Sequence, residues 1–187
     1  YNIPMEQVTK EQRRAAKVIN FGIIYGMSAK SLSDGTGMTF HQAKDFIDRY
    51  MEIRAPIADY LKAQLEHGRK YGYVETFFGR RRPTPDLAAP NFLIRAAAER
   101  AAANMPIQGT AADIIKLAMI RTRDKLLESG IDARLILQVH DELLIETYEE
   151  EVEQVKTILE ENMKQAANLQ VNLEVDLHVG KNWYEAH

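Results

Sequence analysis

Apolar residues recur every three or four positions through much of the chain, a pattern that predicts helices. The stretch Thr9-Lys-Glu-Gln12 has the form of a capping box, and the apolar period after it predicts a helix over residues 10–25, with Gly26 as its stop. The next segment, residues 28–39, is rich in Ser, Thr and Gly, which predicts a loop with one short turn. The same period predicts two further helices, over residues 41–50 and 56–71, the second ending at Gly72.

A short strand and a basic loop are expected next. Tyr73 to Phe78 has strand composition, and Gly79 to Asp86 contains three arginines and two prolines, which predicts a loop. The arginines Arg80, Arg81 and Arg82 could contact backbone phosphates of a nucleic acid without reading its sequence. A solvated loop tip explains them equally well, so the loop alone does not decide between the two.

One long Ala-rich stretch, residues 91–129, has strong helix propensity but contains Pro106 and Gly109. Proline in a helix interior removes a hydrogen bond and clashes with the preceding turn, so we expect a kink or a break there. Thr110 to Asp113 would then cap the second piece, which makes Asp113 a helix cap rather than a ligand, and Gly130 would end it.

The last third of the chain predicts an antiparallel hairpin. Leu135 to Val139 and Leu143 to Ile145 have the composition of its strands, within residues 133–147. An acidic amphipathic helix is predicted over residues 149–168, and the alternation of Val171 to Gly180 predicts a final strand. Helices followed by antiparallel strands indicate an α+β fold.

Composition and charge narrow the functional classes. The 187 residues suffice for one domain or two sub-domains, and the absence of Cys excludes disulfides and thiolate metal sites. No run approaches the roughly 18 apolar residues of a membrane helix, so we expect no membrane partner. Residues 1–104 hold 16 Lys or Arg against 11 Asp or Glu, whereas residues 105–187 hold 8 against 16. This asymmetry fits a phosphate-contacting portion followed by a carboxylate-rich portion, although a solvated acidic helix also explains much of the second.

The predicted first helix carries an unusual stripe. Arg13, Lys17, Phe21 and Tyr25 recur every four residues, so their side chains form one gently curling row. Two cations at i and i+4 repel each other mildly, and the helix dipole disfavours cations near its N-terminus. A bound polyanion would offset both effects, because the two cations and the helix N-terminus would all attract it. Spacing alone favours the plainer alternative, a solvated basic face with the two aromatic residues in the core.

The string R-x-x-x-K-x-x-x-F-G-x-x-Y-G, residues 13–26, resembles the nucleotide-binding helix of the family A DNA polymerases, the bacterial DNA polymerase I type. The resemblance implies that Arg13 and Lys17 hold the β and γ phosphates of a deoxynucleoside triphosphate (dNTP), with Lys17 also catalytic. It implies that Phe21 packs near the sugar and discriminates against sugars lacking a 3′ hydroxyl. Tyr25 would abut the nascent base pair.

A second motif lies in the Ala-rich stretch, where Arg100, Asn104 and Gln108 again fall four residues apart. An amphipathic helix with a solvated polar side would show the same spacing. The segment also resembles the family segment in which such residues line the minor groove of the primer-template. Minor-groove acceptors are common to all correct base pairs, so side-chain donors there would check pair geometry without reading sequence.

The hairpin turn holds His140, Asp141 and Glu142. A solvated turn is the plain interpretation, since His and Asp tolerate the left-handed region. The string QVHDELLIE, however, resembles the metal-binding palm hairpin of the same family. The resemblance implies that Asp141 binds magnesium, that Glu142 binds it or supports the site, and that His140 positions the primer end. It also implies two Mg²⁺ ions and a second Asp in a motif resembling Asp-Tyr-Ser, which these residues lack.

The motifs occur in the family's order, so the chain is identified as a member of family A. We expect residues 1–90 to form most of the fingers and residues 91–187 the second half of the palm. The intact enzyme would be a monomeric, cytoplasmic DNA polymerase of a bacterium or phage that acts on primer-template DNA and dNTPs, and these residues alone would be inactive. Two rival hypotheses are a non-catalytic nucleic-acid-binding domain of polymerase architecture and a helical interaction protein, which would leave the motif order unexplained.

Overall fold

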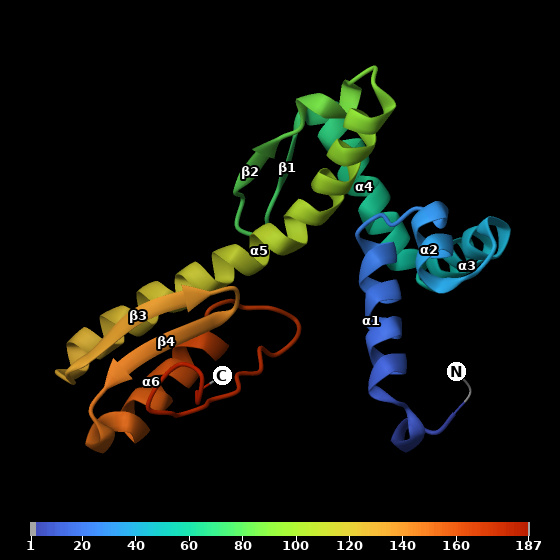
Figure 1. Cartoon of the computed structure of the whole chain (residues 1–187). Helices are drawn as coiled ribbons and strands as arrows, with labels where there is room; N and C mark the ends of the chain where they lie inside the picture. The colour runs from blue at the N-terminus through green and yellow to red at the C-terminus, as the bar shows by residue number, and fades with distance from the viewer. Residues whose placement is uncertain (1–2, 187) are drawn as a thin grey trace. The chain divides into compact units, whose positions relative to one another are not determined.

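The computed structural model describes residues 3–186, and the chain divides into two compact units between Pro106 and Ile107. Both units combine helices with an antiparallel pair of strands (Figure 1), so the predicted α+β class is confirmed. None of the helices in this part of the chain is long and apolar enough to cross a bilayer.

The N-terminal unit is mostly helical. Both predicted stops, Gly26 and Gly72, adopt the left-handed conformation, with φ of 80° each. Glycine reaches that conformation without steric cost, which explains why the helices end there. The elements are η1 (Met5–Gln7), α1 (Lys10–Ile24), α2 (Ala29–Thr36), α3 (Phe40–Ile53), α4 (Ala55–Tyr71), β1 (Tyr73–Glu75), β2 (Arg81–Pro83), η2 (Pro85–Ala88) and the first part of α5 (Phe92–Ser129).

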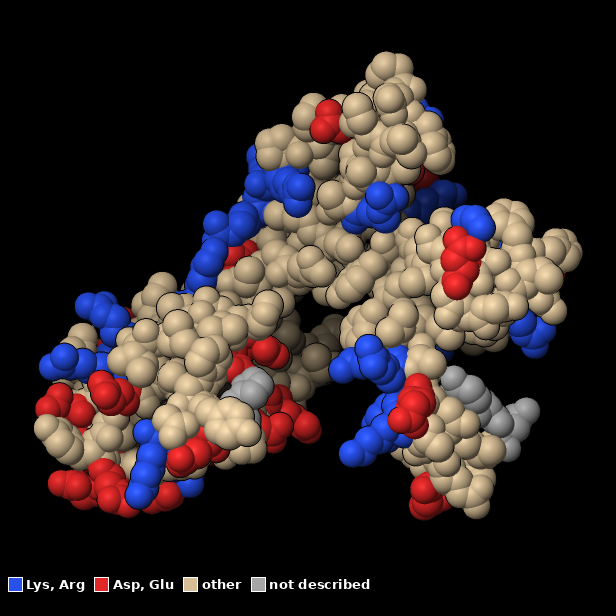
Figure 2. All heavy atoms as spheres, viewed as in Figure 1, with Lys and Arg blue, Asp and Glu red and all other residues tan. Residues whose placement is uncertain are grey.

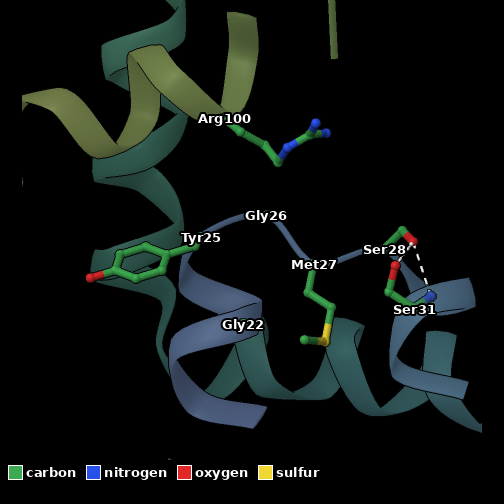
Figure 3. Close-up of a pocket in the computed structure, with 7 residues that line it drawn as sticks. All are labelled: Gly22, Tyr25, Gly26, Met27, Ser28, Ser31 and Arg100. Carbon is green, nitrogen blue, oxygen red and sulfur yellow. Dashed lines mark hydrogen bonds between the residues drawn. The ribbon is translucent and has the colours of Figure 1, made fainter. Parts of the chain in front are cut away.

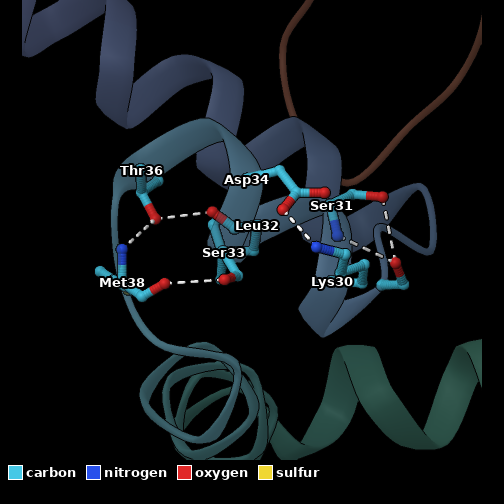
Figure 4. A network of polar contacts seen from close by, with 8 residues as sticks. Lys30, Ser31, Leu32, Ser33, Asp34, Thr36 and Met38 are labelled. Atoms are coloured by element: carbon cyan, nitrogen blue, oxygen red, sulfur yellow. Dashed lines mark hydrogen bonds and ion pairs between the residues drawn. The ribbon is translucent and has the colours of Figure 1, made fainter.

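The predicted loop over residues 28–39 is wrong, because helix α2 occupies most of it. Ser28 and Gly37 are the two ends of this helix: the Ser31 amide donates to Ser28 Oγ at 3.1 Å, and Gly37 closes the helix with φ of 74°. Thr36 Oγ1 also donates to the Leu32 carbonyl at 2.6 Å (Figure 4), and Leu32 is buried. Residues that favour turns also cap helices, so composition alone misjudged this segment.

The predicted basic loop over residues 79–86 is also partly wrong. It contains β2, which pairs antiparallel with β1, and the start of η2. The pair is tied to the end of α4, since the Thr84 amide donates to the Gly72 carbonyl at 2.8 Å and Thr84 Oγ1 to the Gly68 carbonyl at 3.1 Å. Gly68 packs directly against Leu87, since a Cβ at position 68 would come within 2.8 Å of Leu87 Cδ1. A small core joins α4, β1, η2 and α5, made of Val74, Leu87, Ala102, Leu65, Ala98 and Met105.

Helix α5 runs without interruption through Pro106, so the predicted break and the cap formed by Thr110 to Asp113 are wrong. Proline removes only one backbone donor, and the Ala-rich sequence on both sides has the strongest helix propensity. The start and the end agree with the prediction. Asn91 Oδ1 accepts from the Leu93 amide at 2.9 Å, and Gly130 follows the last helical residue with φ of 72°.

The C-terminal unit contains the predicted hairpin. Strand β3 (Ala133–Val139) pairs antiparallel with β4 (Glu142–Thr147), with a register shift that leaves Ile136 as a bulge between Leu135 and Leu137. The acidic segment forms η3 (Glu149–Glu151) and α6 (Val152–Lys164), shorter than predicted. Arg121 of α5 donates a hydrogen bond to the Gln165 carbonyl at the end of α6. The buried side chains of this unit include Ile115, Ala118, Thr122, Leu126, Val155 and Ala166.

The final strand predicted over Val171 to Gly180 is not formed. Burial does alternate, since Leu173, Val175 and Leu177 are partly buried and the residues between them are exposed. No strand within residues 3–186 pairs with this segment. Alternation predicts which side chains turn inward, but a strand also needs a hydrogen-bonding neighbour, which the pattern cannot supply.

Candidate functional site

Helix α1 presents the predicted stripe to solvent. The helix begins with the predicted capping box, in which Gln12 N–H donates to Thr9 Oγ1 at 3.2 Å and Thr9 N–H to Gln12 Oε1 at 2.9 Å. This reciprocal pair satisfies two of the donors that a helix start leaves open. The stripe residues Arg13, Lys17, Phe21 and Tyr25 are all exposed.

The two aromatic residues of the stripe are exposed rather than buried. Their ring centroids lie 6.0 Å apart with an interplanar angle of 32°, and 47% of Phe21 and 38% of Tyr25 is accessible. This excludes the plainer interpretation that placed them in the core. Blue atoms gather along α1 in Figure 2. Two cations followed by two accessible rings on one face of a helix could hold an anion joined to an aromatic group.

A hollow of about 370 Å³ opens where α1 ends, lined by Gly22, Tyr25, Gly26, Met27, Ser28, Ser31 and Arg100. Arg100 extends from α5 over Gly26 (Figure 3), and a Cβ at Gly26 would come within 2.8 Å of Arg100 Cγ. The structure thus brings together Tyr25 and Arg100, which the sequence analysis placed in separate motifs. Sequence indicated Gly26 only as a helix stop and gave no sign of this second role, close packing against an arginine.

The groove motif lies on α5 as predicted. Arg100 and Asn104 belong to the N-terminal unit, and Gln108 follows four residues later in the C-terminal unit. Asn104 is partly buried, whereas Gln108 is exposed. The helix is continuous here, so the spacing of four residues holds along its length. What the three residues contact as a set stays a prediction.

The hairpin turn is tighter than the sequence suggested. Val139 pairs with Glu142, so Glu142 is the first residue of β4 and the turn consists of His140 and Asp141. His140 has φ of 51° and is the one non-glycine residue between 3 and 186 with a positive φ. Gln138 Nε2 donates to the His140 carbonyl at 2.6 Å, which supports the turn. Two-residue hairpin turns require positive φ, usually from Gly or Asn.

Asp141 and Glu142 are both exposed at this tip. Carboxylate oxygens are the ligands that Mg²⁺ prefers, so the donor type fits a magnesium site. Within residues 3–186 no three His, Cys, Asp or Glu side chains come together as a metal site. The two carboxylates therefore fit magnesium as part of a ligand set, with the other oxygens coming from elsewhere. The stripe lies in the N-terminal unit and the hairpin in the C-terminal unit.

Comparison with known proteins places the chain in one family. The family model described as DNA polymerase family A matches residues 1–185. The chain belongs to DNA polymerase family A. The thermostable DNA polymerase I of Thermus thermophilus is 47% identical over 186 residues, which cover 100% of this chain and 22% of that protein. DNA polymerase I of Pseudomonas aeruginosa is 48% identical over 187 residues, covering 100% of this chain and 20% of the relative.

A solved structure of similar sequence has the same fold. The POL domain of Pol1 from M. smegmatis, in complex with DNA primer-template and dNTP, superimposes with a TM-score of 0.93 at 41% identity, covering 98% of this chain and 32% of that one. The family resemblance drawn from the three motifs is thereby confirmed. The chain spans about a fifth of the length of the curated polymerases it matches.

Proposed function

We propose that this chain is the C-terminal part of a DNA polymerase that performs template-directed DNA synthesis when intact. The observation that carries the proposal is the exposed row of Arg13, Lys17, Phe21 and Tyr25 on a capped helix, in a chain that the family A model matches over residues 1–185. The Pol1 domain similar to it holds primer-template and dNTP, which supports the same two partners here.

In the proposed reaction the 3′ oxygen of the primer attacks the α phosphorus of a dNTP. A new phosphodiester bond forms, the bond from the α phosphorus to the bridging oxygen breaks, and pyrophosphate leaves with that electron pair. The hydroxyl proton passes to solvent. Arg13 and Lys17 hold the β and γ phosphates, and Lys17 also offsets negative charge on the leaving group. Phe21 packs on the sugar and Tyr25 on the nascent base pair.

Asp141 and Glu142 are the proposed protein ligands for magnesium in this chain, with Glu142 closer to a supporting role. When bound, a pair of Mg²⁺ ions stabilises the charge of the attacking and leaving oxygens. Because Asp141 occupies a two-residue turn, its carboxylate is held at the end of a paired strand rather than on a mobile loop. His140, in the same turn, orients the primer end.

Arg100, Asn104 and Gln108 are proposed to follow the minor groove of the primer-template, where they accept any correct pair. Arg100 touches Gly26 beside Tyr25, which links this row to the nucleotide helix. In the intact enzyme, residues 1–90 then serve as fingers and residues 91–187 as the second half of the palm. A monomeric enzyme acting on cytoplasmic DNA fits this role.

The test is Asp141→Ala in an intact family A polymerase that contains this segment. Primer extension is expected to fall by about a thousandfold or more, because the metal loses a ligand that no neighbouring group replaces. Binding of primer-template, measured by fluorescence anisotropy, is expected to be unchanged. Asp132→Ala is the matched control, since it removes an exposed carboxylate just before β3.

Unchanged extension by the Asp141→Ala enzyme would refute the metal role. If the unaltered enzyme binds primer-template but extends nothing with magnesium and all four dNTPs present, the alternative holds, and the chain belongs to a non-catalytic nucleic-acid-binding protein of polymerase architecture.

A further inference from the structure

A single side-chain contact fastens the nucleotide helix α1 to helix α3. Tyr50 Oη donates a hydrogen bond to Asn20 Oδ1 at 2.9 Å, across 30 positions of sequence. Within residues 3–186, no other side-chain hydrogen bond or ion pair joins α1 to another helix. Beyond this bond α1 is held by apolar packing, such as that of the buried Ile23. Besides this packing, the pair is therefore the one hydrogen-bonded restraint within residues 3–186 on how α1 turns about its axis.

The geometry of Asn20 leaves little freedom. Its Nδ2 donates to the Ala16 carbonyl at 2.8 Å, one turn earlier on α1. A carbonyl can only accept, so the amide nitrogen must face Ala16 and the amide oxygen must face Tyr50. Rotation of the amide by 180° would set its oxygen against the Ala16 carbonyl and break the hydrogen bond to Ala16. The acceptor is thus fixed to the backbone of the helix that carries Lys17 and Phe21.

The donor is fixed as well. Tyr50 is only 7% exposed, and the Phe46 ring is stacked against it with centroids 6.5 Å apart. Four residues after Tyr50, the Arg54 guanidinium carbon lies 4.0 Å from the Tyr50 ring centroid. Arg54 is also the residue at which α3 ends and α4 begins. The hydroxyl therefore projects from a rigid corner of the unit toward α1.

We propose that Tyr50 is a positioning residue for nucleotide binding, acting through Asn20. Asn20 directly precedes Phe21 and lies three residues after Lys17, so a rotation of α1 released at Asn20 displaces both side chains. The inference rests on the proposed function, because it concerns how the helix meets a dNTP. It assigns Tyr50 no contact with the substrate.

The test is Tyr50→Phe in the intact polymerase, with single-turnover measurement of dNTP affinity and of the incorporation rate. The ring and its stacking are kept and only the hydroxyl is lost. We expect the Kd for dNTP to rise about fivefold, in line with the loss of one net hydrogen bond, with the incorporation rate within about twofold and the primer-template Kd unchanged. Tyr60→Phe is the matched control, because it deletes the hydroxyl of a partly exposed tyrosine of α4 that donates no hydrogen bond to any of residues 3–186.

A double-mutant cycle with Asn20→Ala separates positioning from general loss of structure. If the two residues act through their shared bond, the double variant binds dNTP no more weakly than the poorer single variant. Multiplying effects, or a Tyr50→Phe enzyme that equals Tyr60→Phe, would overturn the inference. Asn20→Ala removes the same hydrogen bond by changing the more exposed of the two residues. If Tyr50→Phe does not fold, the dNTP affinity of Asn20→Ala tests the inference instead. An unaltered enzyme that cannot extend primers would instead refute the proposed function.

Discussion

Helix α1 and the hairpin β3–β4 present polar side chains in opposite ways. On α1 the backbone follows its local signals: a capping box starts the helix, a left-handed glycine follows its end, and the stripe arises from regular spacing. In the hairpin, the residue that opens the turn is His140 in a conformation that favours glycine, and Asp141 follows it. On the helix, the residues that set the backbone are different from the residues that carry the functional side chains. In the turn, His140 and Asp141 do both.

On the helix side of this comparison, the largest effect is expected from Lys17. Lys17→Ala removes a charge from the stripe without touching the helix start, so the fold should be unchanged and extension should fall by about a hundredfold. Both dNTP affinity and incorporation rate are expected to suffer, because the lysine is proposed to serve binding and the leaving group. Single-turnover kinetics measures both.

Arg14→Ala is the matched control for that experiment, since Arg14 is an exposed cation of α1 beside the stripe rather than in it. Its effect on dNTP affinity is expected to stay within about threefold, the size of a screened surface charge. Equal losses of dNTP affinity in the two variants would show that α1 attracts the nucleotide only through its overall positive charge. The position of Lys17 in the stripe would then have no specific role.

The hairpin side is tested by two replacements of His140. Glycine adopts a φ of 51° without steric cost. The free energy of unfolding of the His140→Gly variant should therefore lie within about 1 kcal/mol of the parent's. Valine is branched at Cβ, so His140→Val should lose about 1–2 kcal/mol of stability. Chemical denaturation measures both, and identical stabilities would show that the turn relaxes away from the left-handed conformation.

Activity completes the test of His140. Both replacements remove the imidazole, so both should slow extension by about tenfold if it orients the primer end. An active glycine variant beside an inactive valine variant would assign the effect to the backbone of the turn, and the imidazole would have no role.

Sequence predicted the elements whose signals are local. The capping box of Thr9, the glycine stops and the two strands of the hairpin depend on neighbours within a few residues, and these agreed with the structure. Helix α2 was missed because Ser28 and Gly37 signal a helix end as well as a turn. The strand over residues 171–180 failed for the opposite reason, since pairing depends on a distant partner.

The site divides along the same line. The stripe and the hairpin carboxylates came from spacing and from a family resemblance. No pattern in sequence could show that Arg100 packs on Gly26 or that Tyr50 reaches Asn20, because each contact joins residues brought together only by folding. Contacts of this kind, between a motif residue and an unmarked one, are what the structure adds.

The smallest expected effect compares two capping boxes that share the same two backbone hydrogen bonds. Thr9 with Gln12 starts α1, and Thr39 with Gln42 starts α3, each with bonds of 3.2 and 2.9 Å. Thr9→Ala and Thr39→Ala should each cost about 1 kcal/mol of stability. Only Thr9→Ala should also weaken dNTP binding, by about twofold to threefold, since fraying of the first turn of α1 loosens Arg13, whereas α3 carries no stripe. Equal dNTP affinities in the two variants would mean that the order of the first turn does not matter to nucleotide binding, and the nucleotide site would then begin at Lys17.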